Sequence, residues 1–157
     1  MTALLSDITI TKLPAAPQRA TRERPLVLVA EDDEDTRFLF RTFAEMSGCE
    51  VVEAADGEEA VRLAESARPD LVLIDGSLPR LDGLAPTRRI RELGGARVRV
   101  IFVSGHCDPE FRRAAREAGC DEFVEKPLDF RLFGGSLERH LRAASAGHQF
   151  REGRLAP

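Results

Sequence analysis

Short apolar runs alternate along the chain with longer segments in which apolar residues recur every three or four positions. The apolar runs are LVLVA at 26–30, EVVEA at 50–54, LVLID at 71–75, VRVIFVS at 98–104 and DEFVE at 121–125. The run at 71–75 shows no alternation of apolar and polar residues, which is typical of a central strand buried on both faces. Five strands that alternate with five helices predict an α/β fold with a parallel sheet.

Capping residues indicate where the helices begin. Asp35 is expected to cap a helix at 36–46, because a short acidic side chain can accept a hydrogen bond from the free N–H groups of a first turn. Asp108 followed by Pro109 supplies both an N-cap and a favoured first residue for a helix at 110–118. These signals place helices between the predicted strands, as an α/β fold requires.

The pattern divides the chain into one domain and two tails. Residues 1–24 are polar, include two prolines and show no sustained period, which is typical of a flexible segment. Residues 25–145 are expected to form the domain, with a last helix at about 130–144. The remaining residues, 146–157, are too few for a DNA-binding or catalytic output domain, so we expect a single-domain protein.

Composition narrows the class of protein. The 157 residues are 43% hydrophobic, which suffices for the core of one domain. A net charge of -4 gives no basic face for nucleic acid or anionic membrane, and no apolar run approaches the roughly 20 residues of a membrane span. The three cysteines lack the paired spacing of zinc or redox sites. We therefore expect a cytoplasmic protein that neither inserts into membranes nor binds nucleic acid directly.

Polar residues stand where the predicted strands end, which is the edge at which open parallel sheets bind ligands. They are Glu31 and Asp32, Asp75, Ser104 and Lys126. Neighbouring carboxylates repel one another, so a cation is needed to compensate this group. Lys126 is one of only two lysines among 23 basic residues, which indicates that a compact ammonium is required there.

These motifs together resemble the receiver domain of bacterial two-component response regulators, over residues from about 25 to 144. LVAEDDED is similar to the acidic pair of that family, LVLIDGSLPRLDG to its phosphoacceptor strand and loop, VIFVSGH to its hydroxyl strand and DEFVEKPLD to its lysine-proline turn. Four motifs in the family order make the resemblance specific. It implies a doubly wound (βα)5, flavodoxin-like fold with a five-stranded parallel sheet in the order 2-1-3-4-5.

The resemblance also implies the chemistry of the site. Asp75 would be the phosphoacceptor, Lys126 would neutralise the phosphoryl oxygens, and Ser104 would hydrogen-bond the acyl phosphate. Mg²⁺ would be the missing cation. Its ligands would be Glu31, Asp32, Asp75 and the backbone carbonyl of Ser77.

A switch is implied as well, formed by Ser104 and the aromatic residue Phe123 of the fifth strand. Phe123 lacks the hydroxyl of the tyrosine that is more usual there, so we expect it to switch by burial. Gly76 stands where a bulkier residue is common, which predicts a looser loop. The resemblance further implies that the peptide bond between Lys126 and Pro127 is cis, an isomer whose cost before proline is only about 0.5 to 1 kcal/mol.

The partners implied are a sensor histidine kinase or a histidine phosphotransfer protein as phosphodonor, and a downstream protein. The downstream protein would bind the face of the fourth helix, fifth strand and fifth helix, and a homodimer remains open. The chain would carry out phosphotransfer and autodephosphorylation only, without acting as an enzyme on other substrates.

Two alternatives remain. A haloacid-dehalogenase-like phosphatase also uses an aspartate and Mg²⁺, but its DxDxT signature is matched only by DDEDT at 32–36, where Glu34 replaces the second aspartate. That fold would leave Asp75 unexplained. A receiver-like interaction module that is never phosphorylated is the second alternative, against which the chemically intact key positions argue.

Overall fold

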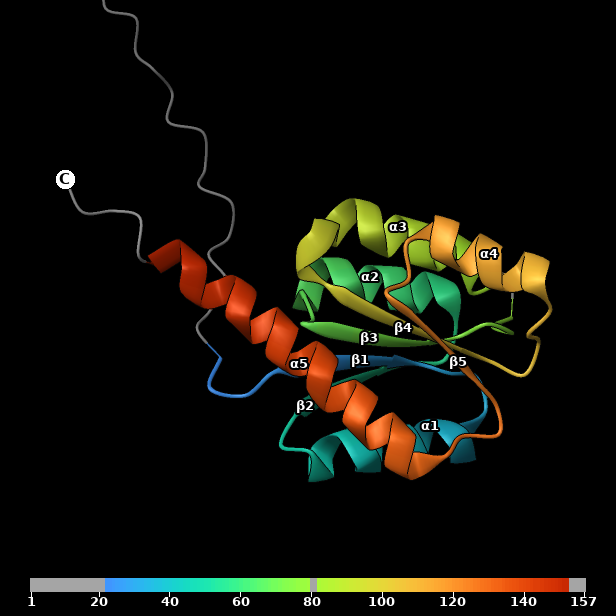
Figure 1. The fold of residues 1–157 in the computed structure, drawn as a ribbon, viewed down its shortest axis with the longest axis horizontal. Helices are drawn as coiled ribbons and strands as arrows, with labels where there is room; N and C mark the ends of the chain where they lie inside the picture. The colour runs from blue at the N-terminus through green and yellow to red at the C-terminus, as the bar shows by residue number, and fades with distance from the viewer. Residues whose placement is uncertain (1–21, 80–81, 153–157) are drawn as a thin grey trace, which may run out of the picture.

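Five parallel strands form one sheet in the computed structural model, which describes residues 22–79 and 82–152 (Figure 1). The strands are β1 (Leu26–Ala30), β2 (Glu50–Ala54), β3 (Leu71–Asp75), β4 (Arg99–Ser104) and β5 (Glu122–Glu125). Their order in the sheet is β2-β1-β3-β4-β5, with every neighbouring pair parallel. The predicted fold class and strand order are confirmed.

Within the described ranges, five α-helices connect and follow the strands, with one 3₁₀ turn at Gly95–Arg97. They are α1 (Glu34–Met46), α2 (Gly57–Ala67), α3 (Leu84–Gly94), α4 (Pro109–Ala118) and α5 (Phe130–Glu152). Helices α1 and α5 cover one face of the sheet, and α2, α3 and α4 cover the other (Figure 1). The sheet is therefore the middle of three layers.

The hydrophobic core has two parts because successive residues of a strand point to opposite faces of the sheet. Val27 and Val29 of β1 belong to the part beneath α1 and α5, together with Phe40 and Phe133. Leu28 belongs to the part beneath α2, α3 and α4. Strands β1 and β3 are buried along their whole length, which confirms that 71–75 is a central strand.

The first helix starts two residues earlier than its pattern predicted. Asp33, with extended backbone angles of φ -74° and ψ 121°, is the N-cap, and its carboxylate accepts a hydrogen bond of 2.8 Å from the Thr36 N–H. Asp35 lies inside the first turn, so the prediction that it caps the helix was wrong. The cap at Asp108 and the first residue Pro109 of α4 are as predicted.

The last helix is longer than its pattern predicted. It continues to Glu152 rather than ending near residue 144, so residues 146–152 are helical rather than an irregular tail. Its last turns extend beyond the sheet (Figure 1). None of the helices within 22–79 and 82–152 is long and apolar enough to cross a membrane.

The predicted N-terminal tail falls mostly on residues 1–21, which lie outside the described residues, so its flexibility stays a prediction. Arg22 donates a hydrogen bond of 2.6 Å to the carbonyl of Ala67, at the end of α2. The carbonyl of Pro25 accepts from Glu50 N–H at 2.9 Å, which aligns the chain with β2 as β1 begins.

Arg91 ties the end of α3 to the turn between α4 and β5. Its Nε and one terminal nitrogen donate to the carbonyl of Gly119 at 2.9 and 2.6 Å, and that same terminal nitrogen pairs with Asp121 at 2.8 Å. The other terminal nitrogen donates to the carbonyl of Val98 at 2.8 Å. One side chain therefore satisfies backbone groups from two connections that would otherwise lack donors.

We expect Arg91→Ala to lower the free energy of unfolding by about 2 kcal/mol, because carbonyls that are partly buried lose charged donors. Arg89→Ala is the matched control, since Arg89 only forms an exposed pair with Glu92 and should change stability by less than about 0.5 kcal/mol. Urea unfolding followed by circular dichroism measures both. Equal losses in the two variants would contradict the role given to Arg91.

Candidate functional site

Three carboxylates gather at the carboxyl edge of the sheet. Glu31 and Asp32 follow β1 directly, and Asp75 is the last residue of β3, the strand beside β1. One oxygen from each of the three side chains lies within 4.8 Å of the others. Glu31 and Asp75 are buried, with 2% and 4% of their surface exposed, whereas Asp32 is exposed. The cluster is thus open to solvent on the side of Asp32.

The ammonium of Lys126 lies against this cluster. Its Nζ is 3.0 Å from Glu31 Oε2 and 3.0 Å from Asp75 Oδ1. The Lys126 N–H donates to the carbonyl of Ser104 at 3.0 Å, which positions the residue beyond the end of β5. The peptide bond between Lys126 and Pro127 is cis, as the resemblance implied. The structure thus brings together four of the residues that the sequence singled out.

Burial and neighbouring charges shift the pKa values of Glu31 and Lys126. Burial raises the pKa of Glu31 above its usual value, and the neighbouring Asp75 charge adds to this, against the opposing effect of Lys126. Burial by itself would lower the pKa of Lys126, but hydrogen bonds to Asp75 and Glu31 outweigh it and raise that pKa. Lys126 therefore stays charged and compensates part of the negative charge.

The turn after Asp75 is closely packed. The Ser77 N–H donates to Asp75 Oδ2 at 3.1 Å, which holds the carboxylate beside the turn. A Cβ atom at Gly76 would lie 2.7 Å from Ser104 Oγ and 2.9 Å from Phe102 Cε1, far inside normal contact distance. Two buried side chains therefore fill the space that a larger residue would need, which explains the glycine at this position, and the looser loop stays a prediction.

Ser104 and Phe123, the expected switch residues, occupy different environments. Ser104 is fully buried at the end of β4, and its Oγ accepts a hydrogen bond of 3.0 Å from the His106 N–H. Phe123 is half-buried on β5 and stacks on Phe102, with ring centroids 5.6 Å apart. The guanidinium of Arg112 lies 4.9 Å from the Phe123 ring centroid.

Phe102 was not singled out from the sequence, although it contacts both Phe123 and the space beside Gly76. The alternation of side chains along a strand could have identified it, because Phe102 precedes Ser104 by two positions and so lies on the same face of β4.

Known proteins are similar to this chain in sequence and in architecture. Residues 27–134 match the family model of the response regulator receiver domain. The chain belongs to the response regulator receiver family. The polar-differentiation response regulator DivK of Brucella anthropi is 33% identical over 116 residues, which cover 73% of this chain and 94% of that protein.

Other receiver domains are part of longer proteins. The cyclic di-GMP phosphodiesterase of Thermotoga maritima is 34% identical over 116 residues, or 74% of this chain, but this chain spans only 31% of its length. Among solved structures, the receiver domain of the sensor histidine kinase PA1611 of Pseudomonas aeruginosa is 31% identical, with a TM-score of 0.69. The match covers 75% of this chain and 98% of that one.

Membership of the receiver family argues against the haloacid-dehalogenase alternative. Glu34 stands where the dehalogenase signature has its second aspartate, and it is exposed in the first turn of α1. Asp75, which that alternative leaves unexplained, lies within the buried carboxylate cluster.

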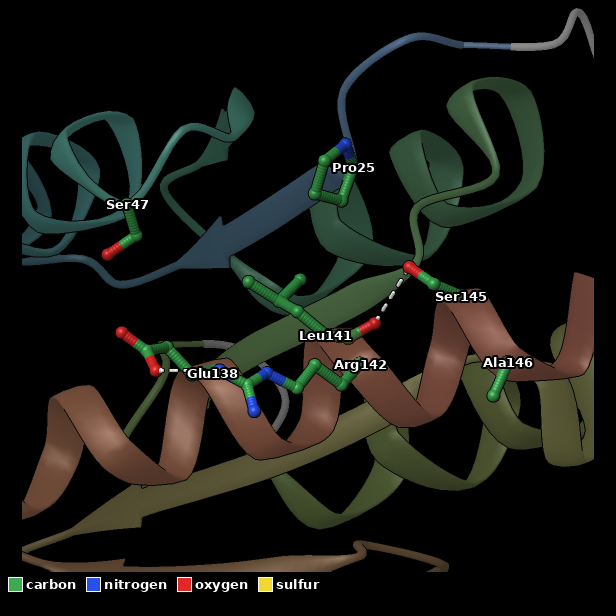
Figure 2. Close-up of a pocket in the computed structure, with 7 residues that line it drawn as sticks. All are labelled: Pro25, Ser47, Glu138, Leu141, Arg142, Ser145 and Ala146. Atoms are coloured by element: carbon green, nitrogen blue, oxygen red, sulfur yellow. Dashed lines mark hydrogen bonds and ion pairs between the residues drawn. The ribbon is translucent and has the colours of Figure 1, made fainter.

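A shallow groove of about 370 Å³ lies at the other end of the sheet (Figure 2). It is formed by Pro25, which precedes β1, by Ser47 at the end of α1 and by one side of α5. The residues from α5 are Glu138, Leu141, Arg142, Ser145 and Ala146. Because Pro25 lies at the amino end of β1, the groove is not part of the carboxylate site.

The pKa of Glu31 leads to a prediction for stability in the absence of divalent cations. Because the pKa of the Glu31 carboxyl is raised in the folded protein, protonation of Glu31 stabilises the fold. This contribution to the free energy of unfolding is fully present below the ordinary pKa of 4.5 and is lost as the pH rises through the pKa of the folded state. Glu31→Gln removes this loss, so the variant should become more stable than the wild type as the pH approaches neutrality. Urea unfolding at several pH values measures the difference.

Glu65→Gln, at an exposed position of α2, is the control and should show no such trend. A Glu31→Gln variant whose stability relative to the wild type does not depend on pH would show that the Glu31 carboxylate is not strained by its surroundings.

Proposed function

We propose that this receiver domain accepts a phosphoryl group on Asp75 from a sensor histidine kinase or a histidine phosphotransfer protein, and signals by phosphorylation-dependent protein binding. The observation that carries the proposal is the ammonium of Lys126, 3.0 Å from both Asp75 and Glu31 within the carboxylate cluster. Phosphoryl transfer depends chiefly on positioning and on compensation of the oxygen charges, and this arrangement can provide both.

The donor set of the cluster fits Mg²⁺. This ion binds hard oxygen ligands, usually one or two carboxylates with phosphate oxygens and water. Glu31, Asp32 and Asp75, with the backbone carbonyl of Ser77, would hold it. Among the described residues, Lys126 is the one cation that forms an ion pair with any of these carboxylates, and it contacts Glu31 and Asp75, so two negative charges remain for a divalent ion. The PA1611 receiver domain, whose structure has a magnesium ion coordinated in its active-site cleft, supports this assignment.

Bound Mg²⁺ would compensate the charge on the phosphoryl oxygens during transfer. An oxygen of Asp75 attacks the phosphorus, and the bond from phosphorus to the histidine nitrogen of the donor breaks. Lys126, which already contacts Asp75, holds a phosphoryl oxygen beside it. The hydroxyl of Ser104, whose oxygen accepts from the His106 N–H, has a proton to donate to another phosphoryl oxygen.

The output surface is the face of α4, β5 and α5, which we propose binds a downstream protein. Phe123 and Arg112 lie on this face between β5 and α4, and Leu132 of α5 is 75% exposed. A large apolar side chain exposed to this degree suits a protein partner. The chain then acts in the cytoplasm as a phosphoacceptor, with phosphotransfer and autodephosphorylation as its only chemistry.

Magnesium affinity should depend on Asp32 and Asp75. We expect Asp32→Asn and Asp75→Asn each to weaken Mg²⁺ binding by about tenfold or more, equivalent to about 1.4 kcal/mol, because each loses a direct carboxylate ligand. Asp35→Asn removes the same charge from the exposed first turn of α1 and is the matched control. The chain has no tryptophan or tyrosine, so titrations followed by amide NMR are suitable. Unchanged affinity in both site variants would place the metal elsewhere.

The function itself is tested by incubation with Mg²⁺ and acetyl phosphate, followed by intact-mass spectrometry. The wild type should gain one phosphoryl group, and the gain should be absent in Asp75→Asn and without Mg²⁺. Hydroxylamine should remove the group, because an acyl phosphate is a mixed anhydride. A wild type that gains no phosphoryl group from acetyl phosphate or from a phosphorylated histidine donor would favour the unphosphorylated interaction module.

A further inference from the structure

The ring of Phe102 lies directly beneath the connection that follows Asp75. Phe102 is completely buried, and a Cβ atom at Gly76 would lie 2.9 Å from its Cε1 atom. A Cβ atom at Gly83, at the other end of this connection, would lie 3.0 Å from Cε2. Gly83 N–H also donates to the carbonyl of Gly76 at 3.3 Å. The ring edge therefore fits against two glycines that contact each other and lie next to the phosphoacceptor.

The same ring contacts the proposed output face. Its centroid is 5.6 Å from that of Phe123, with the planes inclined by 24°, and 5.7 Å from that of Phe111 on α4. Arg112 covers the Phe123 ring, pairs with Glu125 at 2.6 Å and so joins α4 to β5. We call Phe102, Phe123 and Arg112 the aromatic column.

A hydrogen-bonded route between the site and this face is lacking at Phe123, because its side chain has no polar atom. Ser104 Oγ accepts from the His106 N–H, and the His106 ring pairs with Asp108, the N-cap of α4, so this hydrogen-bonded route reaches α4 without passing through Phe123. Contact through the aromatic column is direct, from the completely buried Phe102 to the half-buried Phe123, and close-packed interiors transmit small displacements because they hold few voids.

We propose that Phe102 is a positioning residue of the switch, which couples the backbone at Gly76 by packing to Phe123 on β5 and to Phe111 on α4. The proposal rests on the proposed function, since a phosphoryl group on Asp75 supplies the displacement. Because no gap separates Gly76 from the ring, a shift of this backbone has to move Phe102. The stacked Phe123 ring then has to follow, together with the Arg112 guanidinium above it.

Phe102→Leu tests the coupling, since it shortens the side chain and removes the stacked ring. Phe133→Leu is the matched control, because Phe133 is equally buried but lies on the opposite face of the sheet. Each protein is titrated with beryllofluoride, a phosphoryl mimic, in the presence of Mg²⁺, and amide shifts are followed by NMR. We expect Phe102→Leu to bind within threefold of the wild-type affinity but to show less than half of the wild-type response in α4 and β5. Phe133→Leu should keep the full response.

A second measurement needs no phosphoryl mimic. Gly76→Ala forces an atom against both the Phe102 ring and the Ser104 side chain and should shift the amide signals of Phe123 and α4 in the unmodified protein. In the Gly76→Ala, Phe102→Leu double variant the shifts at Phe123 should become clearly smaller, because the leucine removes the contact of the new methyl group with the ring and leaves only its contact with Ser104.

The outcomes separate the two proposals. A full α4 and β5 response in Phe102→Leu, with wild-type binding intact, would overturn the coupling and leave the phosphoacceptor function standing. Shifts at Phe123 from Gly76→Ala that are undiminished in the double variant would do the same. A wild type that fails to bind beryllofluoride with Mg²⁺ would overturn the function, and the coupling with it.

Discussion

The repulsion among Glu31, Asp32 and Asp75 is the constraint on which the site depends. Two unit charges 4 Å apart repel by about 4 kcal/mol at the effective dielectric constant of a protein surface. Lys126 offsets part of this repulsion by contacting Glu31 and Asp75 at 3.0 Å each. Because one ammonium cannot compensate three carboxylates, the cluster favours an added cation. Repulsion among the carboxylates would therefore be the source of the Mg²⁺ affinity that we propose for this site.

The fold supplies the stability that lets such a site persist. Strands β1 and β3 are buried along their whole length, and the fully buried side chains of Val27, Leu28 and Val29 each contribute about 1.5 to 3 kcal/mol of hydrophobic free energy. The carboxylates begin where this burial ends, at the carboxyl edge of the same two strands. Arrangement of the strands in parallel is what brings residues 31 and 75 together, because both strands then end at one edge.

Periodicity and order along the chain were enough to predict the strands, the sheet and the residues at its edge. Local pattern could not choose between Asp33 and Asp35 as the cap of α1, because both are short acids and only the backbone angles distinguish them. The close packing at Gly76 could not be predicted for a related reason. A glycine in a sequence indicates freedom, whereas here the side chains of Ser104 and Phe102, which are distant in sequence, leave no space for anything larger.

Absence of a hydroxyl on Phe123 changes how a switch in this chain can work. A hydrogen bond would depend on the direction of one donor, whereas stacked rings respond to the position of a whole side chain. Packed elements tend to have discrete arrangements rather than a continuous range, so coupling through rings favours two states. Arg112 lies at the outer end of this packing, where it contacts both the Phe123 ring and Glu125. Displacement of an apolar ring inside the protein would therefore reach the surface as a rearranged charge, which a protein partner can recognise.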